Sequence, residues 1–202
     1  MPMPSGDPGP DVVVVEGGGL RAALVGGKGA SLDRLKALGA PVPPTGVVTT
    51  AAYRRHVRAS GLVTLLAELV ERPPPAPEDH PAEVNRIDAA FLESALSAEL
   101  VDEICGLANR VVQGAGPFRE RGVAVRSSAV AEDLAAASFA GQYRSLLEVA
   151  VDPVALADAV RLTWASLWHP APRAYRRYRR IREDDLAMAV IVMAMLAPSE
   201  SG

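Results

Sequence analysis

The sequence has little of several features that would assign a class of protein at once. Its 202 residues include one cysteine, so no internal disulfide can form, and a thiolate zinc site would need more cysteines. The longest apolar run, residues 186–197, has 12 residues, whereas a membrane-spanning helix needs about 20. The N-terminus lacks the basic stretch and apolar core of a signal peptide. These absences predict a soluble cytoplasmic protein, or part of one, with no membrane partner.

The sequence also lacks a large excess of charge of either sign and any metal-binding pattern. Lysine and arginine number 21 and aspartate and glutamate 24, which gives a net charge of −3 and no reason to expect a nucleic-acid partner. His56, His80 and His169 show no pairing at the spacing of metal ligands, so they are interpreted as ordinary exposed or helix-end histidines, and no metal site is predicted. The arginine-rich segment 172–182 would suit RNA, but a solvated basic helix is the favoured interpretation.

What is present predicts a folded chain of mixed secondary structure. Hydrophobic residues make up 49% and charged residues 22%, which excludes a disordered chain. Residues 1–11, rich in proline and glycine, are expected to form a flexible tail before a domain at 12–202. Strands are predicted at 12–15, 46–49, 123–128, 143–149 and 187–196, and helices at 30–38, 51–59 (capped by Thr50), 62–70, 81–95, 97–113, 152–168 and 172–182. This order predicts an α+β fold with a helical insert, not regular βαβ alternation.

A glycine-lysine segment is the first candidate ligand site. Gly26, Gly27 and Gly29 allow a ligand close to the backbone, and the helix that follows presents unpaired N–H groups at its start. A phosphate is favoured there, and Lys28 adds a full charge. The Walker P-loop is excluded, because its glycine and hydroxyl positions hold Ala22 and Gly29. A flexible turn with a solvated lysine remains the alternative.

An earlier glycine cluster, Gly17 to Gly19, follows the first predicted strand and superficially matches a dinucleotide-binding turn. Such a turn should open a long helix, yet Gly26 and Gly27 interrupt it. No acidic residue closes a second strand about 20 residues later. A Rossmann domain is therefore disfavoured.

A second candidate site follows the strand at 123–128. Arg126 is succeeded by Ser127, and a guanidinium suits phosphate oxygens bidentately; an ordinary surface arginine is the alternative. Ser138, Gly141 and Gln142 belong to a small-residue loop that could fold over a ligand, although by itself it indicates only a turn.

Taken together, these strings resemble the N-terminal nucleotide-binding domain of phosphoenolpyruvate synthase, pyruvate phosphate dikinase and rifampicin phosphotransferase. The resemblance rests on seven strings that occur in the order found in that family. They are LVGGKGASL at 24–32, PVPPTGVVTT at 41–50, VAVRSSA, AEDL and ASFAGQY within 123–143, WASLW at 164–168 and MAVIV at 188–192.

The resemblance implies an ATP-grasp fold in which ATP lies between two lobes. It implies that Lys28 and Arg126 bind ATP phosphates, with Arg126 also the candidate catalytic residue. The remaining ATP-binding candidates by resemblance are Gly26, Gly27, Gly29, Ser127, Ser138, Gly141 and Gln142, the last three in a loop at 138–142 that would cover the phosphates. Members of the family transfer the β-phosphoryl group of ATP to a histidine on a separate domain, and then to pyruvate or another acceptor.

The sequence also departs from the family. It ends at Gly202, where the family continues into a second lobe, so the expected Mg²⁺ ligands lie beyond the chain. Five substitutions depart from the family pattern, at Ala135, Ala136, Ala171, Met193 and Ala194. The chain is therefore expected to be inactive alone. The leading hypothesis is that the chain is the first lobe of a phosphoenolpyruvate synthase-like phosphotransferase. A second hypothesis is a binding module whose apolar C-terminal strand offers an exposed edge or face to a second chain. The third is a decayed fragment.

Overall fold

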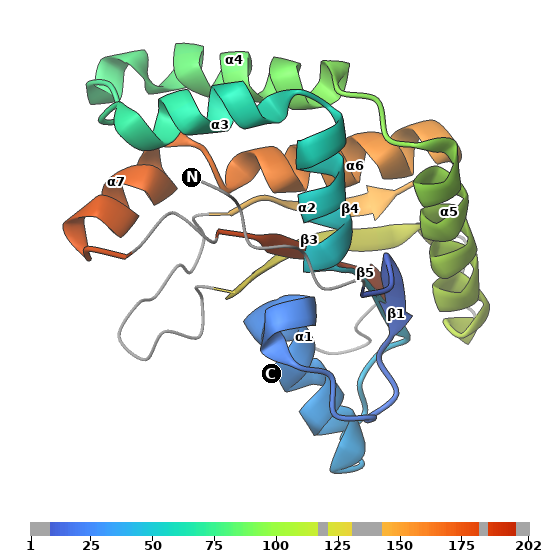
Figure 1. The fold of residues 1–202 in the computed structure, drawn as a ribbon. Helices are drawn as coiled ribbons and strands as arrows, with labels where there is room; N and C mark the ends of the chain where they lie inside the picture. The colour runs from blue at the N-terminus through green and yellow to red at the C-terminus, as the bar shows by residue number, and fades with distance from the viewer. Residues whose placement is uncertain (1–8, 117–120, 131–142, 182–185, 197–202) are drawn as a thin grey trace.

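The computed structural model describes residues 9–116, 121–130, 143–181 and 186–196. Within these ranges one five-stranded sheet organises the chain (Figure 1), with the strand order β1-β2-β5-β3-β4. Every pair of neighbouring strands is antiparallel. The strands are β1 (Val12–Val14), β2 (Thr45–Val48), β3 (Val123–Ala129), β4 (Ser145–Val149) and β5 (Met188–Ala194). This mixed architecture confirms the predicted α+β class.

Helices cover both faces of the sheet unequally (Figure 1). The helix α1 (Ala22–Ala37) packs alone on one face, and α5 (Ala98–Gln113) and α6 (Pro153–Ser166) pack on the other. The remaining helices pack on the side of α5 and α6, and they are α2 (Thr50–Ala59), α3 (Leu62–Glu71), η1 (Pro77–Asp79), α4 (His80–Glu93) and α7 (Pro170–Tyr178). The main core lies on that side, and a smaller cluster lies under α1.

Strand register decides which side chains face α1. Arg126 of β3 pairs with Ile191 of β5, and Ser128 pairs with Ala189. Because successive side chains of a strand point to opposite faces, these four residues share the α1 face. Val125 of β3 and Val190 of β5, which neighbour these residues along the strands, belong to the main core.

The C-terminal strand lies in the middle of the sheet. β5 is buried along nearly its whole length, as predicted, and it is hydrogen-bonded to β2 on one side and β3 on the other. The expectation that it offers an exposed edge is therefore wrong. Among the described strands, β1 and β4 form the edges, because the chain returns between two earlier strands at its C-terminal end.

Several local boundaries differ from the predictions. Thr49, not Thr50, caps α2 through its hydroxyl, which accepts from the N–H of Ala52 at 3.3 Å. The predicted helix at 152–168 ends at Ser166. Residues 9–11, placed in the predicted flexible tail, hydrogen-bond to Thr49 and Arg55, so they pack against α2. None of the described helices is long and apolar enough to cross a bilayer.

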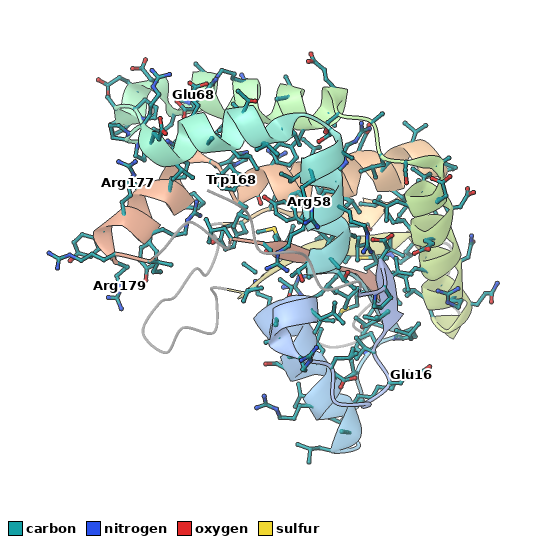
Figure 2. All side chains as sticks on the ribbon, viewed as in Figure 1. Glu16, Arg58, Glu68, Trp168, Arg177 and Arg179 are labelled. Atoms are coloured by element: carbon teal, nitrogen blue, oxygen red, sulfur yellow. The ribbon has the colours of Figure 1, made fainter. Side chains whose placement is uncertain are left out.

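The arginine-rich helix α7 is not simply a solvated basic helix. Arg173 and Arg176 are completely buried, whereas Arg177 and Arg179 are exposed at the surface (Figure 2). The guanidinium of Arg176 lies 5.8 Å from the centre of the Trp168 ring and donates to the carbonyl of Leu167. Tertiary packing thus buries Arg173 and Arg176 in the core.

His56 lies in the last turn of α2, which is one of its two predicted placements, but its side chain is buried and not exposed. Its ring stacks on Trp164 at 5.3 Å between centres, and its Nε2 lies 3.0 Å from the hydroxyl oxygen of Ser94. That hydroxyl donates to the carbonyl of Phe91, so Nε2–H is the donor to Ser94. Burial, and secondarily the charge of Arg161, lower the pKa of His56 from 6.5 to about 4.

Acidification should therefore destabilise the fold through His56. The unfolded chain binds this proton near pH 6.5 and the folded chain only near pH 4, so stability falls as the pH drops between these values. The expected loss is about 3 kcal/mol. Urea unfolding at pH 7 and pH 4 measures it, with His56→Gln as the non-titrating comparison. An equal pH dependence in both proteins would contradict the assignment.

Candidate functional site

The candidate site begins at a kink in α1. Gly26 has φ +69° and ψ 171°, which is not helical, so a first turn at Ala22–Val25 is separated from the main helix that follows. This backbone conformation is essentially restricted to glycine. The kink gives the segment at 27–37 its own helix start directly beside the end of β3.

Ser128 fastens this helix start to the sheet. Its hydroxyl donates to the carbonyl of Val25 at 2.8 Å and accepts from the N–H of Gly29 at 3.0 Å. Gly26 packs so closely on Ser128 that an added Cβ would lie 1.9 Å from the Ser128 carbonyl oxygen. The glycine segment is therefore a close-packed joint between α1 and β3, not a flexible turn.

A pocket of about 220 Å³ lies between this helix and the sheet. It brings together the two cations that the sequence singled out, Lys28 from α1 and Arg126 from β3. The other described side chains that line it are Ser31, Leu32, Leu35, Ile191 and Met193.

The charge of the pocket suits an anion. Lys28 and Arg126 are both exposed, and none of the described lining residues is acidic. The Nζ of Lys28 lies 3.4 Å from the carbonyl oxygen of Ser127, which directs it toward the end of β3. Two cations beside a helix start are typical of phosphate-binding sites.

The other predicted ATP-binding residues take different places. Ser127 is buried and alternates onto the main-core face of β3, so only its carbonyl faces Lys28. Gly26, Gly27 and Gly29 are buried at the joint, and the N–H of Gly29 is engaged by Ser128. Three of the predicted residues lie outside the described ranges, namely Ser138, Gly141 and Gln142.

The backbone N–H groups at the first glycine cluster are hydrogen-bonded to a carboxylate of the same chain. The carboxylate of Asp33, buried on α1, accepts from the N–H groups of Gly17, Gly19 and Leu20 at 2.7–2.8 Å. Burial opposes ionisation, but these bonds together with that of Gly18 outweigh it and hold the pKa of Asp33 below its usual value. The amides that a dinucleotide would need are thus occupied, which agrees with rejecting a Rossmann turn.

Ser128 and Asp33 were not among the predicted site residues, although the sequence holds a signal for each. Strand alternation from Arg126 places Ser128, and not Ser127, on the same face. On α1, Val25, Gly29 and Asp33 recur every four residues on the buried side. A carboxylate at such a position must find donors, and the glycine cluster is the nearby source.

The described residues contain no group of three or more histidine, cysteine, aspartate or glutamate side chains that could hold a metal ion.

Comparison with known families agrees with this architecture. Residues 22–202 match the family model described as pyruvate phosphate dikinase, AMP/ATP-binding domain. The chain belongs to this family. It is similar to a rifampicin phosphotransferase of Streptomyces sviceus, with 38% identity over 90% of this chain. It is also similar to phosphoenolpyruvate synthases of Aeropyrum pernix (35%) and Methanothermobacter thermautotrophicus (34%, named probable), each over 89% of this chain. The chain spans only 20–26% of the length of these relatives.

Proposed function

We propose that this chain binds the phosphates of ATP between Lys28 and Arg126, as one lobe of the nucleotide-binding domain of a phosphotransferase. The convergence of these two cations on one pocket carries the proposal, because they come from elements almost 100 residues apart in the chain and no described acidic residue lines the pocket. Family membership supports ATP as the ligand.

Each cation has a distinct role in this proposal. The planar guanidinium of Arg126 can hold two phosphate oxygens at once and orient them, whereas Lys28 contributes a compact, mobile charge. Arg126 also serves as the candidate catalytic residue, because phosphoryl transfer depends on positioning and on stabilising charge on the transferred group. In the whole enzyme, the β-phosphoryl group would pass to a histidine and then to pyruvate or another acceptor, as the likeness to phosphoenolpyruvate synthases and a rifampicin phosphotransferase suggests.

Exposed apolar side chains at the C-terminal end of α1 support a second lobe over the pocket. Leu35 lines the pocket and is 46% exposed, and Leu38, one turn later, is 77% exposed. Neighbouring apolar side chains left in solvent favour a covering surface. A further part of the same protein or a separate polypeptide would supply this second lobe, and with it any Mg²⁺ ligands.

A thermal melt with and without Mg-ATP tests phosphate binding. A ligand at 100 times its Kd that binds only the folded state stabilises it by about 2.7 kcal/mol, which raises the Tm of a domain of this size by about 5–10 °C. Lys28→Ala and Arg126→Ala should each weaken ATP binding about 10- to 100-fold, through the loss of a charged hydrogen bond, and so reduce the shift.

Lys36→Ala is the matched control, because Lys36 is an exposed lysine on the same helix outside the pocket. It should retain the full shift. Equal shifts in Lys28→Ala and Lys36→Ala, or no shift in the unaltered protein, would contradict the proposal.

A further inference from the structure

We infer that Ser31 is a third phosphate-binding residue, whose hydroxyl donates a hydrogen bond to an oxygen of the phosphate chain held between Lys28 and Arg126. The inference rests on the proposed function, since it assumes that these two cations bind the phosphates of ATP. It adds a neutral donor to the two charges.

One face of α1 lines the pocket. Its four lining residues have the spacing i, i+3, i+4 and i+7, namely Lys28, Ser31, Leu32 and Leu35. This spacing places their side chains on one side of a helix. The two polar residues come first, nearest the kink, and the two leucines follow toward the C-terminal end. The polar half of this face therefore lies at the start of the helix.

The contact between α1 and β3 brings Ser31 and Arg126 to the same pocket. The N–H of Gly29 donates to the Ser128 hydroxyl at 3.0 Å, which holds the helix start against the strand. Arg126 lies two residues from Ser128 on the same face of β3, or about 7 Å along the strand. Ser31 lies two residues after Gly29 on α1. Because both residues line the pocket, the helix and the strand leave their contact in the same direction.

The Ser31 hydroxyl can supply a donor in addition to the backbone. Side chains of a helix tilt toward its N-terminus, so this hydroxyl leans toward Lys28. Beyond the first turn of a helix, backbone N–H groups are used within the helix, and the N–H of Gly29 already donates to Ser128. A phosphate lying along this face meets side chains, and a serine hydroxyl is a short, neutral donor that suits its oxygens.

Ser31 is not required for the stability of the helix. Its side chain is exposed, and serine is a weaker helix former than alanine. Replacing it with alanine should leave the fold intact or stabilise it slightly. A loss of affinity in this variant would therefore report a contact to the ligand and not a damaged fold.

Isothermal titration with Mg-ATP and a thermal melt without ligand test the inference in Ser31→Ala. We expect the Kd for ATP to rise about 5- to 20-fold, through the loss of a hydrogen bond to a charged group. The Tm of the free protein should stay the same or rise by about 1–2 °C. Ser31→Thr keeps the hydroxyl, so its Kd should stay within about 3-fold of that of the unaltered protein.

Salt dependence separates the neutral donor from the cations. Raising NaCl from about 0.05 to about 0.5 M screens charges and should weaken ATP binding to the unaltered protein. Ser31→Ala should keep the same salt sensitivity, because it removes no charge, whereas Lys28→Ala should lose part of it. A reduced salt sensitivity in Ser31→Ala would contradict a neutral contact.

Inorganic tripolyphosphate identifies the part of the ligand that Ser31 contacts. Ser31→Ala should weaken tripolyphosphate by the same factor as ATP, and a loss confined to ATP would place the contact on the nucleoside and overturn the inference. If Lys28→Ala weakens ATP binding but Ser31→Ala does not, the inference alone fails. If the unaltered protein binds neither ligand, the proposed function fails with it.

Discussion

Gly26→Ala is expected to lower the free energy of unfolding by about 4 kcal/mol, or to prevent folding. Two independent costs combine in this variant. The φ of +69° with ψ 171° is strained for any residue with a Cβ by about 1–3 kcal/mol. The new methyl would also lie 1.9 Å from the carbonyl oxygen and 2.4 Å from the carbonyl carbon of Ser128, so the joint between α1 and β3 must open at a further cost of about 1–3 kcal/mol.

Urea unfolding measures the effect of Gly26→Ala, with Gly18→Ala as the control. A Cβ added at Gly18 meets no atom within 4 Å, so this control should change stability by less than about 0.5 kcal/mol. Any folded Gly26→Ala protein should also bind ATP poorly, because opening the joint displaces Lys28 from Arg126. A variant as stable as the Gly18→Ala control would show that Gly26 does not pack on Ser128.

Arg173→Ala is expected to destabilise the protein by about 3–5 kcal/mol, the range for breaking a buried ion pair. The Arg173 side chain is 1% exposed, and its Nη1 lies 2.5 Å from the Glu83 carboxylate. Its Nη2 donates to the carbonyls of Leu69 and Arg72 at the C-terminus of α3, at 2.6 and 2.7 Å. Truncation leaves the carboxylate and both carbonyls without these donors, so α3, α4 and α7 lose a shared contact.

Arg177→Ala provides a control of the same residue type on the same helix. Arg177 is exposed (Figure 2) and donates to the carbonyls of Val70 and Glu71. Solvent can replace these bonds, so the variant should cost less than about 1 kcal/mol. Chemical denaturation of both variants gives the comparison. Similar losses from Arg173→Ala and Arg177→Ala would refute a special role for the buried cation.

Much of the local structure follows from short-range pattern in the sequence. The alternation and β-branched content around 123–128 predict β3, and the helices at 62–70 and 97–113 match α3 and α5. Ser97 and Asp152, the first residues of the predicted helices at 97–113 and 152–168, cap α5 and α6 by accepting from backbone N–H groups. These features depend on residues a few positions apart, which is why the sequence shows them directly.

The candidate site was only partly predictable for the same reason. Glycines beside a lysine, and an arginine at the end of a strand, are local patterns, so Lys28 and Arg126 could be named without a structure. Their convergence on one pocket depends on the Ser128 contacts to Val25 and Gly29, which join segments about 100 residues apart in the sequence.

By itself, the sequence determined the α+β class, most of the helices and strands, and the resemblance to an ATP-binding family that the comparison then showed. Only the tertiary structure decided that β5 lies in the centre of the sheet, that Arg173 and His56 are buried, and that Asp33 occupies the amides of the first glycine cluster. Each of these depends on contacts between distant segments. The polarity of a residue alone does not predict these placements, because a charged or polar side chain can be buried wherever packing supplies enough hydrogen-bond partners.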